Sequence, residues 1–304
     1  MPKARRTELD RLRAAAEIWD QHLPEVGYLA RLFTQTSLPY RDPGDVPAWG
    51  RRNGSLSLVV QPGMRIDQSG KPVSIGYPYG TIPRLLLTWL STEAVRTQSA
   101  ELSLGSSLAE FMRSLELQPT GGRNGTITRL RLQMERLFQA TLSVRWEGQP
   151  DRQAGARLNV ASAYDLWWAD ADPSQPVLLP SCVRLSAEFY TEVTEHPVPL
   201  DLAALRALRG SPLRLDIYAW LTYRMSYLRR RSEVPSESLR AQFGSNNANT
   251  KQGRAQFRKD FERNLREVVL VYRQANVEVA SGGVVLLPSP THVGPRALPF
   301  GSLD

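Results

Sequence analysis

Apolar residues recur at every third or fourth position in several stretches of the chain, which is the spacing of amphipathic helices. The most regular stretch covers residues 250–269, and a simpler version covers residues 125–138. At about 100° per residue, each predicted helix has a narrow apolar arc. The arc contains Phe257, Phe261, Leu265 and Val268 in the later helix, and Ile127, Leu130, Met134 and Phe138 in the earlier one.

The segments around these two basic helices also correspond to each other. Residues 81–90 predict a helix with Thr81 as its N-cap. Residues 106–115 predict another, in which Ser107 and Glu110 have the spacing of a capping box. After the helix at 125–138, strands are expected at 140–146 and 156–160. The same order returns as helices at 212–225, 235–243 and 250–269, followed by strands at 277–279 and 284–287.

Three helices followed by two strands is the element order of a winged helix, and its repetition indicates an internal duplication. We therefore expect an α+β fold with two winged-helix domains, preceded by an N-terminal helix and a small β extension. Short strands are expected at 55–61 and 71–77 in that extension, and at 176–180 and 183–186 between the domains. The expected boundaries are 1–80 for the extension, 81–165 for the first domain, 166–200 for bridging strands, 201–290 for the second domain and 291–304 for a flexible tail. We expect the chain to be loose from Pro288 onward.

The polar sides of the two basic helices carry the side chains with which proteins read DNA. In the later helix we expect Gln252, Gln256, Lys259, Arg263 and Arg266 to point outward, and in the earlier one Thr128, Arg129, Gln133 and Arg136. Arg and Lys can bond guanine, and Gln can bond adenine, in the major groove. Gln252 and Gln256 are the better candidates for base edges, whereas Arg254 is expected to point toward the core. The alternative is that both polar sides are only solvated surface.

The positive charge of the chain is concentrated in one segment, which favours the DNA-binding interpretation. The net charge is +8, and residues 206–273 alone hold 15 Lys and Arg against 6 Asp and Glu, a surplus of nine. A concentrated basic region is typical of a surface that meets a phosphate backbone. A solvated basic face or an anionic membrane surface would give the same surplus. Arg123, Lys71 and the run at 229–231 are candidates for auxiliary phosphate contacts.

Several other classes of protein have little support. No stretch approaches the roughly 20 apolar residues of a membrane span, and the N-terminus does not resemble a secretory signal, so we expect a cytoplasmic protein. The single Cys182 excludes an intrachain disulfide and is expected to be a buried thiol. The three histidines lack metal-ligand spacing, and no phosphate-binding loop motif occurs, so we expect no metal, no cofactor and no enzymatic activity.

Three groups of residues resemble plasmid-encoded replication initiators of the RepA type: Gly27-Tyr-Leu-Ala-Arg31, Gly80-Thr-Ile-Pro-Arg-Leu-Leu-Leu-Thr-Trp-Leu90, and Ser106-Ser-Leu-Ala-Glu-Phe-Met112 followed by Gly121-Gly122. The resemblance runs from about Gly27 to Val293. It implies a protein that binds repeated duplex DNA sequences at its plasmid's origin, promotes opening of the origin together with a host initiator, and recruits the host replicative helicase. It further implies tandem winged-helix domains, with homodimers formed when the protein represses its own gene.

Two other functions remain open from the sequence. A transcriptional repressor would bind operator palindromes instead of direct repeats. A primase-like nucleotidyltransferase would use Asp170 and Asp172, whose spacing on a strand would place two carboxylates on one side, as a Mg²⁺ site requires.

Overall fold

The computed structural model describes residues 24–149, 152–167, 181–244 and 247–294. Along the first half of the chain the elements are β1 (Val26–Ala30), α2 (Arg31–Gln35), β2 (Trp49–Asn53), β3 (Leu56–Gln61), β4 (Met64–Ile66), β5 (Pro72–Ser74), α3 (Thr81–Thr97), β6 (Glu101–Ser103), α4 (Leu108–Ser114), α5 (Thr126–Gln139), β7 (Thr141–Gln149), β8 (Arg152–Asn159) and β9 (Ala161–Asp165). The second half contains β10 (Cys182–Leu185), α6 (Ala187–Glu195), β11 (Pro197–Asp201), α7 (Leu202–Leu208), α8 (Pro212–Tyr227), β12 (Ser232–Pro235), α9 (Ser236–Phe243), α10 (Lys251–Val271), β13 (Val277–Ala280) and β14 (Gly283–Leu286). The fold is therefore mixed α+β, as the sequence predicted.

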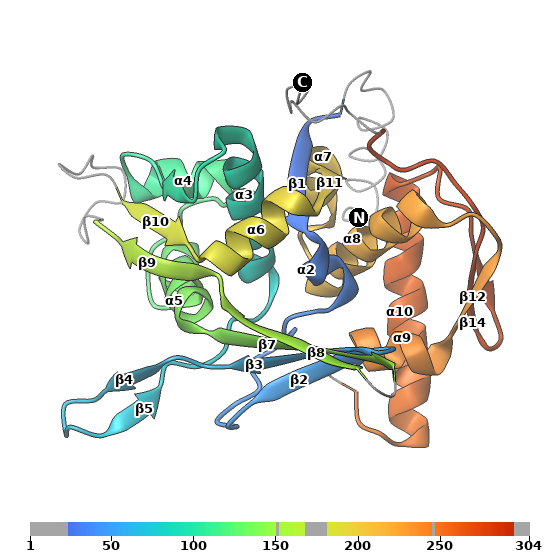
Figure 1. The fold of residues 1–304 in the computed structure, drawn as a ribbon, viewed down its shortest axis with the longest axis horizontal. Helices are drawn as coiled ribbons and strands as arrows, with labels where there is room; N and C mark the ends of the chain where they lie inside the picture. Colours follow the sequence, from blue (N-terminus) through green and yellow to red (C-terminus); the bar gives the residue numbers. More distant parts are fainter. Residues whose placement is uncertain (1–23, 150–151, 168–180, 245–246, 295–304) are drawn as a thin grey trace, which may run out of the picture.

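The largest sheet is antiparallel, with the strand order β2-β3-β7-β8, and forms the lower layer in Figure 1. Its upper side is apolar because alternate residues such as Leu58, Val60, Leu142 and Val144 are fully or almost fully buried. The expected β extension is thus not a separate hairpin. Its strand β3 pairs along its whole length with β7, which follows the first basic helix.

Two smaller sheets join other distant parts of the chain. Strand β1 pairs with β11, so residues 26–30 lie beside the segment expected to bridge the two domains. Strand β10 lies between β6 and β9. In β10 the exposed and buried residues alternate, and Cys182 is on the exposed side, so the expectation of a buried thiol was wrong.

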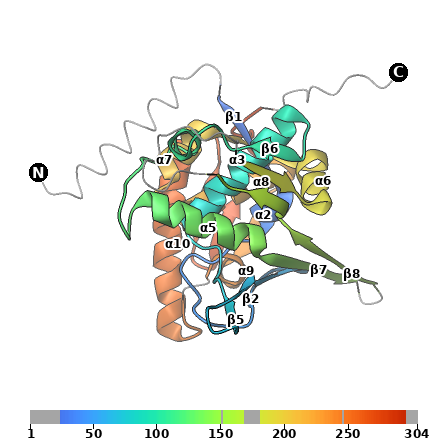
Figure 2. The same ribbon diagram turned by 90° about the vertical axis from the view of Figure 1, so that its left-hand side faces the viewer.

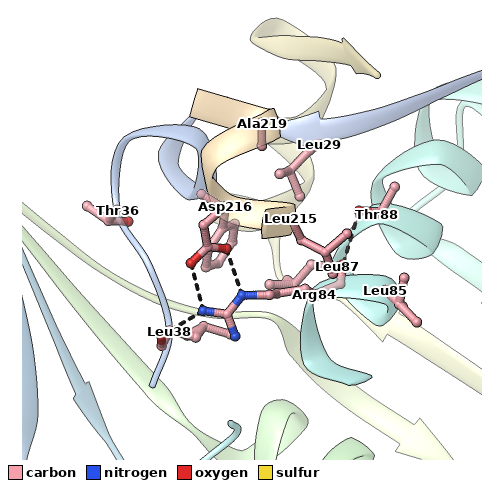
Figure 3. Close-up of a pocket in the computed structure, with 11 residues that line it drawn as sticks. Leu29, Thr36, Leu38, Arg84, Leu85, Leu87, Thr88, Leu215, Asp216 and Ala219 are labelled. Carbon is pink, nitrogen blue, oxygen red and sulfur yellow. Dashed lines mark hydrogen bonds and ion pairs between the residues drawn. The ribbon is translucent and has the colours of Figure 1, made fainter. Parts of the chain in front are cut away.

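A buried ion pair holds the two long helices α3 and α8 together, as Figure 3 shows. The Arg84 Nε and Nη2 atoms donate to the two carboxylate oxygens of Asp216 at 2.6 and 2.8 Å. The guanidinium also donates to the carbonyl oxygens of Gly80 at 2.6 Å and Leu38 at 2.8 Å, and lies over the ring of Tyr40. Burial alone would lower the pKa of Arg84, but the facing Asp216 carboxylate outweighs this and raises it, whereas burial raises the pKa of Asp216 although Arg84 opposes that shift.

The second half has a three-stranded sheet with the order β12-β14-β13 beside helices α8, α9 and α10. The expected strands correspond to β13 and β14, whereas β12 was not expected. The expectation that the chain is loose from Pro288 onward was wrong for residues 288–293, which pack against the second half. The Tyr272 hydroxyl donates to Pro290 O at 2.6 Å, and His292 stacks on the Tyr272 ring. The Nδ1 atom of His292 is also 2.8 Å from the Tyr218 hydroxyl.

The helix ends follow the expected chemistry with small shifts. Gly80, not Thr81, is the N-cap of α3, and Ser107 caps α4 by accepting from the Glu110 backbone N–H at 3.2 Å. The Glu110 carboxylate accepts a hydrogen bond from Ser106 N at 2.7 Å. In a complete capping box it would instead accept one from the backbone N–H of the cap residue, Ser107. The expected N-terminal helix before residue 24 and the expected strand at 176–180 lie outside the described residues. Within the part of the chain that is described, no helix combines the length and apolarity needed to span a membrane.

Candidate nucleic-acid interface

Helix α10 is anchored by the apolar arc that its sequence predicts. Phe257, Phe261, Leu265 and Val268 are all buried. Phe261 packs against Phe243 of α9 with ring centroids 5.5 Å apart, and the helix lies along α8. An aromatic anchor of this kind fixes the rotation of the helix, and so determines which side chains point away from the protein.

The start of α10 is held by its own first turn. The Thr250 hydroxyl caps the helix by accepting from Gly253 N at 3.0 Å. A Cβ atom at Gly253 would lie 2.1 Å from the carbonyl oxygen of Ala248, so only glycine allows the preceding turn to pack this closely. The N-terminal end of α10 therefore has a defined position, at the lower edge of the molecule in Figure 1.

The outward face of α10 holds the residues that the sequence placed there: Gln252, Gln256, Lys259, Arg263 and Arg266 are all exposed. Arg254 is exposed as well, so the expectation that it points toward the core was wrong. The reason is that the buried arc begins only at Phe257, and the first turn of the helix extends beyond the core. Lys251 in the same turn is also exposed, although it was not among the DNA-binding residues predicted from the sequence.

Acidic side chains hold part of this face in place. Asp260 accepts from Gln256 Nε2 at 2.9 Å and from Arg263 Nη2 at 2.7 Å, and Arg266 lies 3.8 Å from Glu262. Such solvent-exposed pairs contribute little to stability, so phosphate groups can compete for the same cations. The side chains of Gln252 and Lys259 have no hydrogen bond or ion pair with other described residues.

Helix α5 begins in a similar way. A Cβ atom at its N-cap Gly125 would lie 2.2 Å from Thr120 O, so here too a turn packs closely against a glycine. The side chains of Thr120 and Thr126 each accept a hydrogen bond from the other residue's backbone N–H at 2.9 Å. Arg123, Thr128 and Arg129 are exposed around this end of the helix, as expected.

Two other residues of α5 do not point outward. Gln133 is buried, and its Oε1 accepts from Tyr79 N at 2.8 Å. The Arg136 Nε donates to Ile75 O at 2.8 Å, its Nη1 is 3.3 Å from Asp42, and its side chain is only 13% exposed. The expected outward orientation of both residues was wrong because the segment before α3 lies over this side of α5.

The auxiliary cations differ in their surroundings. Lys71, Arg229 and Arg230 are exposed, whereas Arg231 is paired with Glu233 at 2.5 Å. The charge surplus of residues 206–273 is partly offset from outside that segment, because Arg206 contacts both Glu25 at 2.8 Å and Glu116 at 2.7 Å. The surplus that remains accessible is therefore concentrated on α10 and the loop after α8.

The residues of the rival nucleotidyltransferase hypothesis, Asp170 and Asp172, lie outside the described residues. Among the residues with a described position, no group of three or more His, Cys, Asp and Glu side chains is arranged to hold a metal ion.

Comparison with known proteins supplies the family. Crystal structures of domains 2 and 3 of RctB share 12% sequence identity with the chain. One has a TM-score of 0.47 and covers 83% of this chain and 94% of its own, and the other has a TM-score of 0.46 with 84% and 94%. No curated protein matches the chain. The family model described as "Plasmid encoded RepA protein" matches residues 77–237, which is more than half of the sequence and includes α3, α5 and α8. The chain belongs to the family of plasmid-encoded RepA proteins.

Proposed function

We propose that this protein is a plasmid replication initiator that binds repeated duplex DNA sequences at the origin, with α10 as its principal recognition helix. Family membership supports the role in plasmid replication. The observation that carries the DNA-binding proposal is the exposed row of Gln and basic residues on a helix whose opposite side is fixed by buried aromatic rings. Amide and guanidinium groups on a rigid helix suit the major groove.

The two halves act as two winged-helix units, approximately residues 81–165 and 201–290. Each has the order long helix, short strand, helix, basic helix and two strands. In the second unit the short strand β12 joins the final hairpin, as in a winged-helix sheet. In the first unit the corresponding hairpin β7-β8 joins β3 instead, while β6 pairs with β10. We therefore propose that the two units are related by duplication and that the first unit differs from the second in its strand pairing.

Both basic helices can serve one DNA molecule. In Figure 2 the N-terminal end of α5 and the length of α10 lie toward the left side of the protein. Helix α10 supplies Gln252 and Gln256 for base edges and Lys259, Arg263 and Arg266 for phosphates, while Arg123, Thr128 and Arg129 at α5 add auxiliary contacts. The protein works in the bacterial cytoplasm without enzymatic activity, forms a homodimer when repressing its own gene, and directs the host initiator and replicative helicase to the opened origin.

The test is a binding titration on a duplex that carries one direct repeat of the plasmid's own origin, at several salt concentrations. Lys259→Ala together with Arg263→Ala should weaken binding and reduce the slope of log K against log salt by about 1.8, at about 0.9 per phosphate contact. The matched control is Arg113→Ala with Arg184→Ala, which removes two exposed cations from α4 and β10. An unchanged affinity and slope in the α10 variant would show that the DNA face is elsewhere.

A further inference from the structure

The lower side of the four-stranded sheet is a solvent-exposed face with an unusual composition. Side chains alternate along each strand, so the residues opposite the buried ones all lie on this side. We call them the outer sheet face: Gly50, Arg52, Ser57, Val59, Gln61, Thr141, Ser143, Arg145, Gly155, Arg157 and Asn159. None of them is buried, and the three arginines and two glycines are exposed.

The helices with a described position cover the opposite side of this sheet. In Figure 1, α5 and α6 lie above it, on the side where Leu58, Leu142 and Val144 are buried in the core. Among the described residues no helix lies beneath the outer sheet face. At one edge of the sheet, β2 packs against α9, which in turn packs against α10. A duplex that contacts the first turn of α10 can therefore continue beneath the sheet.

The charge on the outer sheet face has one sign. Arg52 and Arg145 lie in the same cross-strand row, since both are opposite Ser57 of β3. Arg157 is opposite Ser143, which makes it a diagonal neighbour of Arg145. The three guanidinium groups thus project from one side of the sheet without any two being directly opposite, and an anion bound between them would offset their mutual repulsion. Glu147 of β7 lies 3.4 Å from Arg52 and offsets part of this charge.

The shape of the face suits a partner that lies flat. Between the arginines the side chains are small, and Gly50 and Gly155 have none. Glycine inside a strand often marks a place where another molecule approaches the backbone closely. The outward positions of all four strands lack aromatic side chains, on which unpaired bases would stack. These features favour the phosphate backbone of a duplex over single-stranded DNA.

We propose that the outer sheet face is a second DNA contact surface, where Arg52, Arg145 and Arg157 bind phosphates of the duplex that extends from α10. This inference rests on the proposed DNA-binding function. It assigns to the sheet a contribution to affinity that does not depend on base sequence, because phosphates are the same at every step. A second copy of the chain is a poor occupant, since it would bring six arginines together.

The experiment compares full-length wild-type protein with the triple variant Arg52→Gln, Arg145→Gln, Arg157→Gln. Binding is measured by fluorescence anisotropy on an origin-repeat duplex with extended flanks and on a random duplex of equal length. The salt slope should fall by up to about 2.7 on both duplexes, at about 0.9 per lost contact. The preference for the origin repeat should be unchanged. The matched control Arg96→Gln, Arg113→Gln, Arg184→Gln removes the same charge from exposed positions on α3, α4 and β10.

The outcomes separate the two proposals. If the triple variant has the same slope as the matched control while the α10 variant loses affinity, the inference about the sheet is wrong and the proposed function stands. A loss of affinity for single-stranded oligonucleotides alone would also overturn it. If wild-type protein does not prefer the origin repeat, the proposed function fails, and the random duplex still reports whether the sheet binds phosphates. Circular dichroism on each variant checks that these exposed substitutions leave the fold intact.

Discussion

The ion pair between Arg84 and Asp216 gives a sharp prediction about how the two halves of the molecule are held together. The side chains are 8% and 9% exposed, and the contact is bidentate. Breaking a buried pair by removing one partner leaves an uncompensated charge and costs about 3–5 kcal/mol. In Asp216→Ala, the Arg84 guanidinium keeps its bonds to Gly80 O and Leu38 O, so we expect the lower end, about 3 kcal/mol.

Arg84→Met should cost more, because it leaves the Asp216 carboxylate unpaired and removes the guanidinium donor from Gly80 O and Leu38 O, while Pro39 O keeps its bond from Gly80 N. Each unmet carbonyl adds about 1 kcal/mol, which gives a total of about 5 kcal/mol. The double variant Arg84→Met, Asp216→Leu contains no buried charge and loses only the carbonyl contacts. It should therefore be more stable than Arg84→Met by about 2 kcal/mol or more, although it carries an additional substitution.

The free energy of unfolding is measured by urea titration, followed by both circular dichroism and tryptophan fluorescence so that any intermediate is detected. The control is Glu101→Ala, which breaks the exposed pair with Arg184 and should cost less than about 1 kcal/mol. Our reasoning is refuted if Asp216→Ala unfolds like that control, or if the double variant is less stable than both single variants.

Two further predictions concern residues that the fold buries. Arg136→Ala should lower the free energy of unfolding by about 2 kcal/mol, through lost bonds to backbone carbonyls. The Arg136→Ala variant should have the same salt slope of DNA binding as the wild type. A slope reduced by about 0.9 would show that Arg136 contacts a phosphate after all. Burial lowers the pKa of His292, and the Asp201 carboxylate only partly opposes this. The unfolded chain therefore binds the proton more readily, so wild-type stability should fall as the pH drops below about 6.5. His292→Phe, which keeps a ring on Tyr272, should reduce that loss between pH 7.5 and 5.5 in thermal melts, and an equal loss in both proteins would contradict the assignment.

Local patterns were sufficient to predict the helices that carry the candidate site. The periodicity of Phe257, Phe261, Leu265 and Val268 gave both the extent of α10 and its buried side. The predictions of the Ser107 cap and of the apolar arc of α5 also depended on neighbouring residues alone, and both are confirmed. These features depend on residues three or four positions apart, which is the range that a periodic pattern can encode.

Pairings between distant segments were not predictable in this way. The pairing of β3 with β7 joins residues 80 to 90 positions apart, and nothing in either strand specifies its partner. The burial of Gln133 and Arg136 has the same origin, since the residues that cover them belong to the segment before α3. A helical wheel divides residues into two faces but does not show that a second segment lies on the polar one. Strand β12 was missed because it is short and ends in proline.

The burial of those two residues makes the two basic helices unequal. Segment 75–79 occupies one side of α5, so only Arg123, Thr128 and Arg129 of the expected set remain available there. Helix α10 keeps its whole outward face and gains Lys251 and Arg254. Because the buried Arg84–Asp216 pair and the paired strands β1 and β11 connect the two halves, the separation between the two helices is set by the protein. If the proposed function holds, a partner duplex must match this fixed spacing, and we expect α10 to supply most of the sequence discrimination and α5 to select the register of the neighbouring backbone.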